Sequence, residues 1–171
     1  MMDSQSVGEL DVAFAPHRLP DALQFMRLLW ALVHGLDRTS KRMFGEIGVT
    51  GPQRLVLRVV GLFPGLSAGE LATVLHMHPS TLTGILKRLV TQRLLMRSNA
   101  AHDQRRAVLH LSPVGARINS AHRGTVESAV NDALRGISAQ DRAATKRVLE
   151  RLTAHLEAPR RRHRARQPRP S

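Results

Sequence analysis

The segment after Pro79 carries short hydroxyl and basic side chains on one side of a predicted helix. Apolar residues recur at i, i+3, i+4 and i+7 from Leu82, so they form one buried stripe. The other face suits hydrogen bonding to base edges in the DNA major groove, and a helix N-terminus attracts phosphate. A solvated face on an ordinary surface helix is the alternative. The candidate DNA-contacting residues of this face are His78, Ser80, Thr81, Thr83, Gly84, Lys87 and Arg88.

A second basic cluster lies between two short apolar segments. Residues 94–98 and 107–111 are predicted strands, and a charged turn separates them. Arginine at the tip of a hairpin suits the minor groove, where a narrow width enhances the negative potential. Asp103 would repel phosphate, so we expect it to orient Arg105 or Arg106 through a bidentate pair.

The elements that must position these clusters are predicted to be mostly helical. Thr50-Gly51-Pro52-Gln53 and Ser67-Ala68-Gly69-Glu70 match capping boxes, and Ser112 and Ser138 are further capped starts. A long first helix is predicted from Pro20 to about Glu46, because apolar residues recur there at helical spacing. The remaining helices are predicted at about 51–63, 67–76, 79–92, 112–135 and 139–157.

Composition limits the classes of function. The chain has 171 residues and a formal net charge of +13, which favours polyanionic partners, above all nucleic acid. Residues 158–171 carry six arginines and no acid, so residues 1–157 still carry +7, and we expect this tail to be disordered. The absence of cysteine excludes disulfides and thiolate chemistry. Only five aromatic residues argue against single-strand and RNA modules, which stack bases on aromatic rings.

No membrane association is expected. The most apolar stretch, Leu55–Phe63, is nine residues long and contains Arg58, so it is too short to span a bilayer. The N-terminus lacks the apolar segment of a signal peptide. We therefore expect a cytoplasmic protein that associates with the nucleoid.

Two short motifs carry little weight. Residues 65–69 match the G-x-S-x-G pattern of a nucleophile elbow, but that motif needs a preceding buried strand, and Ser67 already has a capping role. No nucleophile, base or cofactor loop is assembled elsewhere, so we expect no enzyme activity and no cofactor. His76-Met77-His78 lacks further residues for a tetrahedral site, so no metal site is predicted, although a metal-sensing regulator stays open.

The order and spacing of these motifs resemble the multiple-antibiotic-resistance regulator (MarR) family over roughly residues 20–157. The resemblance is carried by Ser67–Ala72, Pro79–Thr83, Leu94-Leu95, Asp103–Ala107 and Leu111–Gly115, of which the Asp-x-Arg-Arg wing followed by Leu-Ser-Pro-x-Gly is the most specific part. The fold class implied is mainly α: a winged helix-turn-helix with a small β-hairpin wing, plus long N- and C-terminal helices that form a dimerisation lobe. His78 departs from the family pattern, in which a serine often stands before this proline.

The resemblance implies roles and a domain organisation. Ser80, Thr81, Thr83 and Lys87 would contact the major groove and Arg105 the minor groove, with Asp103 and Arg106 bracing the wing. Residues 1–19 would form an arm, 50–111 the DNA-binding lobe, 20–46 and 112–157 the dimerisation helices, and 158–171 the tail. A homodimer implies a pseudo-palindromic operator with half-sites about 34 Å apart on double-stranded DNA. The faces for dimerisation are Val126, Ala129, Val130 and Ala133, then Ala144, Val148, Leu152 and Leu156.

A small-molecule effector is also implied, because members of the family often release DNA when an aromatic, anionic molecule binds. Trp30, His34 and Arg38 lie at i, i+4 and i+8 of the first helix. An aromatic surface beside a histidine, which switches between neutral and cationic forms, and a fixed cation suits an aromatic carboxylate. The alternative is that Trp30 packs in the core while His34 and Arg38 line a solvated or dimer-facing edge. The functional hypothesis is a sequence-specific repressor released by such a ligand; a non-specific architectural protein of the nucleoid is the competing one.

Overall fold

The computed structural model describes residues 19–100 and 103–158, without the side chains of residues 103 and 104. The predicted N-terminal arm and arginine-rich tail lie almost wholly outside this range. The chain divides into two compact units, the first ending at Val126 and the second starting at Glu127, and each is described by itself. Between residues 19 and 158, no helix has the length and apolar character needed to cross a membrane.

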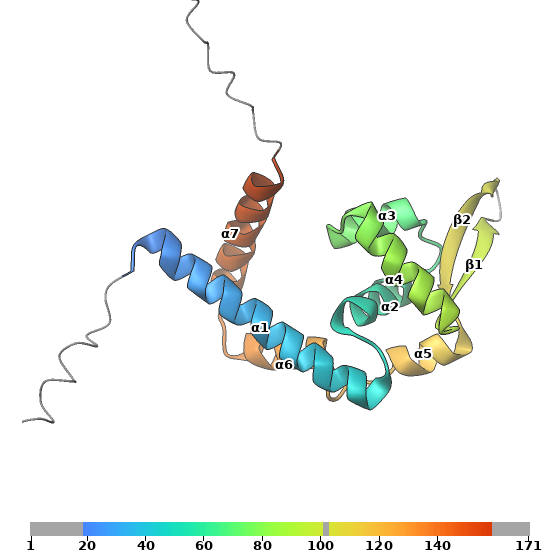
Figure 1. Cartoon of the computed structure of the whole chain (residues 1–171), viewed down its shortest axis with the longest axis horizontal. Coiled ribbons are helices and arrows are strands. Elements are labelled where there is room, and N and C mark those ends of the chain that lie inside the picture. Colours follow the sequence, from blue (N-terminus) through green and yellow to red (C-terminus); the bar gives the residue numbers. More distant parts are fainter. Residues whose placement is uncertain (1–18, 101–102, 159–171) are drawn as a thin grey trace, which may run out of the picture. The chain divides into compact units, whose positions relative to one another are not determined.

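The described part of the chain is mainly helical, with one antiparallel hairpin, which confirms the predicted fold class (Figure 1). Most predicted elements agree with the observed ones to within a residue or two. The helices and strands are α1 (Asp21–Ile47), α2 (Gly51–Leu62), α3 (Ala68–Leu75), α4 (Pro79–Thr91), β1 (Leu95–Ala100), β2 (Asp103–Leu111), α5 (Pro113–Asn119), α6 (Val126–Arg135) and α7 (Ala139–Glu157).

The predicted helix caps are present. The Thr50 and Ser67 hydroxyls accept hydrogen bonds from the backbone N–H groups of Gln53 and Glu70, whose side chains accept from the cap residues in return. Ser112 and Ser138 cap α5 and α7 in the simpler way, through one side-chain acceptor each. Because each cap satisfies N–H groups that a helix start leaves unbonded, the short helices α2 and α3 begin at defined residues.

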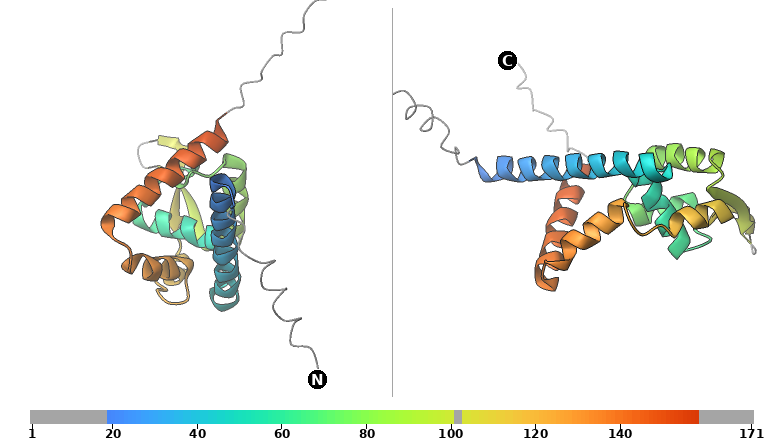
Figure 2. Two further views of the ribbon diagram at one scale, coloured as in Figure 1. Left: turned by 90° about the vertical axis from the view of Figure 1, so that its left-hand side faces the viewer. Right: turned by 90° about the horizontal axis from the view of Figure 1, so that it is seen from below.

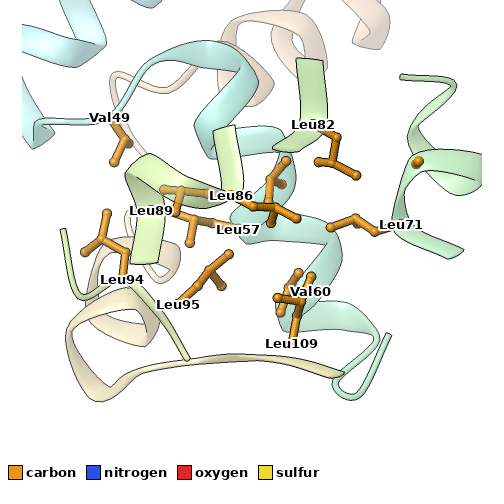
Figure 3. Close-up of a cluster of buried hydrophobic side chains, with 12 residues drawn as sticks. Val49, Leu57, Val60, Leu71, Leu82, Leu86, Leu89, Leu94, Leu95 and Leu109 are labelled. Atoms are coloured by element: carbon orange, nitrogen blue, oxygen red, sulfur yellow. The ribbon is translucent and has the colours of Figure 1, made fainter. Parts of the chain in front are cut away.

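The core of the first unit forms where α2, α3, α4 and the base of the hairpin meet. In Figure 3, Leu82, Leu86 and Leu89 of α4 point toward Leu57 of α2. These four side chains are at most 1% exposed. The labelled cluster is completed by Val49, which precedes α2, and by residues of α2, α3 and the base of the hairpin, namely Val60, Leu71, Leu94, Leu95 and Leu109. The buried stripe predicted for α4 is therefore confirmed, with Ile85 partly buried at its edge.

The hairpin extends further than predicted. β1 and β2 pair in register from Leu95 with Leu111 to Asn99 with Ala107, and a register shift follows beyond Asn99. Polar residues that were predicted to be a turn therefore continue both strands. Residues 101 and 102, which separate the two strands in the sequence, lie outside the described range.

The prediction of one helix over residues 112–135 is wrong. Instead of one helix there are two: α5 ends at Asn119, and α6 begins at Val126. The cause is Arg54 of α2, which is 1% exposed and donates hydrogen bonds to the carbonyl oxygens of Ile118 and Ala121 at 2.5 and 2.6 Å. A buried cation at a helix C-terminus satisfies carbonyls that a continuing helix would have bonded internally. Gly124 then turns the chain with a φ of +71°.

The glycine in the Leu-Ser-Pro-x-Gly motif permits a close approach of two backbones. A Cβ atom on Gly115 would lie 2.0 Å from the carbonyl oxygen of Leu94. Ser112 links the same elements, because its hydroxyl donates to the Arg93 carbonyl oxygen at 2.6 Å and accepts from the Gly115 N–H at 2.9 Å. The start of α5 is therefore fixed against the segment that joins α4 to the hairpin.

The first helix is long and mostly exposed. α1 runs unbroken from Asp21 to Ile47 (Figure 2) and places Met43 alone among its residues in the buried core. A hydrogen bond from the Gly51 N–H to the Ser40 hydroxyl oxygen ties its last turns to the start of α2. The apolar residues of α1 that remain more than a third exposed are Leu23, Phe25, Met26, Leu28, Trp30, Leu32, Val33, Leu36 and Phe44.

The second unit is a pair of helices with no buried residue in either. Ser138 caps α7, and Arg142 donates a hydrogen bond to the Leu134 carbonyl oxygen at 3.0 Å, which joins α7 to the end of α6. Val130, Val148 and Leu156, predicted for a dimer face, are 40%, 42% and 80% exposed. The unit therefore presents apolar surface that the described chain does not cover.

Candidate nucleic-acid interface

The polar face of α4 is open to solvent along its whole length. His78, Ser80, Thr81, Thr83, Gly84, Lys87 and Arg88 are all exposed. Ser80, Gly84 and Lys87 follow one another at i, i+4 and i+7, so they line the centre of this face, opposite the buried leucines. The fold therefore brings all the α4 residues that the sequence singled out to one surface.

His78 is the N-cap of α4. Its Nδ1 atom accepts a hydrogen bond from the Ser80 N–H at 3.3 Å and lies 2.7 Å from the Ser80 hydroxyl oxygen. Because Nδ1 is the acceptor, the neutral imidazole carries its proton on Nε2. The histidine that departs from the family pattern thus performs the capping role that serine would have performed.

Some hydroxyl groups of this face already have partners within the helix. The Thr83 hydroxyl donates to the Pro79 carbonyl oxygen at 2.8 Å, and the Ser80 hydroxyl is paired with the ring of His78. Lys87 and Arg88 add two positive charges one turn further along. The face therefore offers cations, a bare backbone at Gly84 and hydroxyl groups whose orientation is fixed.

The hairpin is joined to the same group of helices by backbone hydrogen bonds. The Leu109 N–H donates to the Leu66 carbonyl oxygen at 2.9 Å, and the Gly65 N–H donates to the Leu109 carbonyl oxygen at 3.0 Å. The loop that leads into α3 thus pairs with β2. Since α4 also packs against β1, the wing and the helix pair form one body.

Arg106 connects the wing to α3 through Glu70. Its guanidinium Nη2 lies 2.6 Å from Oε1 and 2.5 Å from Oε2 of Glu70. Hydrogen bonds from the Ser67 backbone and hydroxyl, and then from Arg106, lower the pKa of Glu70 from 4.5 to about 2. The sequence had suggested Asp103 as a partner for one of the wing arginines. The observed partner of Arg106 is Glu70, which the sequence had identified only as a capping residue.

The structure describes the other wing residues only in part. Arg105 is exposed on β2, one residue before Arg106. The side chain of Asp103 lies outside the described residues, so its role in orienting Arg105 stays a prediction. The structure thus supplies one wing brace, from Arg106 to Glu70.

The three candidate effector residues lie on the exposed surface of α1. Trp30 is 59% exposed, and His34 and Arg38 are exposed beyond it on the same helix. Trp30 is therefore not buried within the single chain, and its role at a ligand site stays a prediction. The exposed edge for His34 and Arg38 agrees with either interpretation.

Residues of the G-x-S-x-G motif and of the His76-Met77-His78 segment have structural roles at helix ends. Ser67 of the G-x-S-x-G sequence caps α3 and hydrogen-bonds Glu70, as expected. His78 caps α4, while His76 ends α3 with a φ of +48°. Within the described ranges, no group of three or more histidine, aspartate or glutamate side chains is placed to hold a metal ion.

Comparison with known proteins adds an independent finding. The sequence model of the MarR family matches residues 47–106, which run from the end of α1 through Arg106 of the wing. Over these residues, which carry most of the winged helix, the chain is similar to the MarR family. This family consists of transcriptional regulators and not enzymes.

Two curated relatives and one solved structure illustrate the MarR likeness. The organic hydroperoxide resistance transcriptional regulator of Bacillus subtilis (strain 168) is 28% identical over 93 residues, covering 54% of this chain and 63% of the relative. The HTH-type transcriptional regulator TtmR of Methylorubrum extorquens (strain PA1) is 31% identical over 100 residues, covering 58% and 50%. The matches thus span less than two thirds of either relative.

The solved structure shows the MarR fold alone, because sequence identity is low. The S. aureus MepR–DNA complex has a TM-score of 0.64 and 18% identity, covering 78% of this chain and 98% of that one. The superposition therefore extends the likeness from the matched residues 47–106 to most of the chain.

Proposed function

We propose that this chain is a transcription regulator that binds double-stranded DNA sequence-specifically through α4 and the wing. One observation carries the proposal: the exposed α4 face and the arginine-bearing wing belong to one body, fixed by the Arg106–Glu70 contact and by backbone pairing at Leu109. A helix and a hairpin held together in this way suit adjacent grooves of one duplex. The MarR relatives named as regulators and the DNA-bound structural neighbour support the same assignment.

The decisive experiment compares wild type with a variant in which Lys87 and Arg105 are both alanine. Target fragments are first selected from genomic DNA with the purified protein. We expect the double variant to lose most of its affinity for the selected fragment, with the single variants intermediate. Lys41→Ala is the charge-matched control for each single variant, because it also removes one positive charge and Lys41 lies on α1, paired with Asp37 at 2.8 Å. Unchanged affinity of the double variant would refute the proposed interface.

A non-specific architectural protein is the competing function, favoured by the net charge of +13. The two functions differ in sequence preference, because binding through charge alone shows a steep salt dependence and no preferred site. Measured at one salt concentration, the selected fragment should bind at least about a thousandfold more tightly than random DNA of equal length. Equal affinities would assign the chain to the architectural class. Deleting residues 158–171 should weaken binding to both DNAs alike.

The proposed regulator is a homodimer. The exposed apolar residues of α1 extend over more than half of the helix circumference, and a second copy is the partner that would cover them. The second unit, taken by itself, also exposes Val130, Val148 and Leu156, which a second copy would likewise cover. Light scattering should therefore give twice the chain mass of 18.9 kDa. Leu28→Glu, with Leu28 58% exposed, should shift the protein toward monomer, while Arg27→Glu on the polar side of α1 should not.

The proposed regulator is a repressor that releases DNA on binding an aromatic acid at Trp30, His34 and Arg38. An exposed indole beside a histidine and a fixed cation suits an aromatic carboxylate. Trp30 is the only tryptophan of the chain, so quenching of its fluorescence reports on this surface directly. Salicylate and benzoate should quench the emission and release bound DNA, and Arg38→Ala should weaken both effects in parallel. DNA release without quenching would place the effector elsewhere.

A further inference from the structure

A hollow of about 340 Å³ lies between α3 and the start of α4. Small and apolar residues line most of it, among them Ala68, Gly69, Met77 and Leu82. Gly69, Thr73 and Thr83 at its edge are exposed, so the hollow opens to solvent. Thr83 belongs both to this lining and to the polar face of α4, which makes the hollow continuous with the candidate DNA interface.

The two hydroxyl-bearing side chains of the lining both donate inside their own helices. The Thr73 hydroxyl donates to the Gly69 carbonyl oxygen at 3.1 Å, and the Thr83 hydroxyl donates to the Pro79 carbonyl oxygen at 2.8 Å. Each threonine has one hydroxyl proton, and these hydrogen bonds engage it. The lining thus has no charged residue and no free side-chain hydroxyl donor, and apart from the two threonine oxygens it presents methyl, methylene and backbone surface. A hollow of this kind selects an apolar group.

The major groove displays one such group. Each base pair presents donors and acceptors there, and the C5 methyl of thymine is the apolar exception. We propose that the hollow at Thr83 accepts a thymine methyl group, so that Thr83 specifies thymine through its own methyl rather than through its hydroxyl. This inference rests on the proposed DNA-binding function and assigns the chemistry of one contact in it.

The test removes one methyl at a time from each side of the contact. Sites are selected from a random duplex library with the wild-type protein, and each thymine of the selected site is replaced by deoxyuridine, which lacks only the methyl. One thymine in each half-site should show an affinity loss of about fourfold, the value of one buried methyl group. Thr83→Val keeps the methyl and should preserve this ratio, whereas Thr83→Ser should reduce it to about one.

Controls separate the contact from general damage. Thr91→Ser, at the last residue of α4 and outside the lining, should leave the thymine-to-deoxyuridine ratio unchanged. Thermal melting of each variant shows whether it folds, and the ratio is compared only within one variant, so a uniform loss of affinity does not affect it.

The outcomes distinguish this inference from the function on which it rests. If no sequence is enriched from the library, the sequence-specific function fails and the inference falls with it. If sites are enriched but every deoxyuridine binds as well as thymine, or Thr83→Ser keeps the fourfold ratio, only the inference is overturned. Saturable binding of toluene at the Thr83 methyl, seen by NMR without a thymine effect, would likewise overturn it and assign the hollow to a small apolar molecule.

Discussion

The carboxylate of Glu70 serves two elements at once. It accepts the Ser67 N–H and hydroxyl hydrogens that start α3, and it contacts the guanidinium of Arg106 on β2, thirty-six positions later in the chain. One side chain therefore closes a capping box and holds the wing. The wing arginines are thus positioned relative to α4 partly by Glu70, which precedes α4 in the sequence.

Removing this contact should loosen the wing without unfolding the core. We expect Glu70→Gln and Arg106→Gln each to weaken binding to a selected DNA site by about two- to fivefold, since exposed ion pairs contribute modestly. Gel-shift titration of both single variants and the double variant forms the measurement. The double variant should lose no more than the larger single loss. If the losses multiply, the two side chains act independently and Glu70 does not position the wing.

The lowered pKa of Glu70 gives the contact a defined pH dependence. A carboxylate with a folded pKa of about 2, against 4.5 otherwise, stabilises the folded state above pH 4.5. That stabilisation is lost as the pH falls from about 4.5 toward 2. Melting temperatures measured between pH 6 and pH 2.5 should therefore fall more steeply for the wild type than for Glu70→Gln. Parallel curves would show that Glu70 is not stabilised in this way.

No packing contact within the fold requires glycine at position 84. A Cβ atom there would meet no other atom within 4 Å, and glycine inside a helix is about 1 kcal/mol less favourable than alanine. Gly84→Ala should therefore stabilise the protein by about that amount and weaken DNA binding by about tenfold, because DNA approaches the bare backbone. Gly45→Ala in α1, equally uncrowded, is the matched control. It should stabilise the fold alone, and an equal DNA effect in both would exclude close approach at Gly84.

The His78 cap can be exchanged for the residue that usually performs the role. His78→Ala should destabilise the fold by about 1 kcal/mol in urea unfolding and weaken DNA binding, because the N–H of Ser80 loses its acceptor. His78→Ser should recover the stability, since serine is a strong cap. If it also recovers DNA binding, the histidine acts through the cap; continued loss of binding would indicate a direct contact of the imidazole with DNA.

Arg54 should be the most sensitive polar residue of the first unit. Its replacement by methionine leaves the carbonyl oxygens of Ile118 and Ala121 without their buried donor, so we expect a loss of about 3 kcal/mol or more in the free energy of unfolding. Arg58→Met is the control, because Arg58 is only partly buried and donates to the backbone and side-chain oxygens of Asn119 at the longer distances of 3.2 and 3.3 Å. Equal losses would show that the burial of Arg54 is unimportant.

The helix starts could be predicted because their information is local. A capping box occupies four consecutive residues, and the α4 stripe repeats within two turns, so Thr50, Ser67 and Leu82 identify their elements without tertiary structure. Because helical spacing is also local information, the sequence predicted that the candidate DNA-contacting residues of α4 share one face. Their contacts with DNA stay predictions, as do those of the wing.

The remaining features depend on partners that are distant in sequence. Arg54 ends α5 from sixty-four positions upstream, and nothing in the pattern of residues 112–135 shows that a buried guanidinium will donate to its carbonyl oxygens. Arg106 likewise had a nearby carboxylate at Asp103 and a distant one at Glu70, and spacing alone favoured the nearer. The hollow at Thr83 was not visible in the sequence, because it depends on how α3 and α4 pack.

The hydrogen bonds that Arg54 donates also have a mechanical consequence. α2 packs against α1, α3, α4, α5 and β2, so it is the central helix that connects the elements of the first unit. Arg54 fastens the chain after α5 to this helix, because its guanidinium donates to the carbonyl oxygens of Ile118 and Ala121. α4 and the wing strand β2 both pack against α2, so we expect them to move with it as one body.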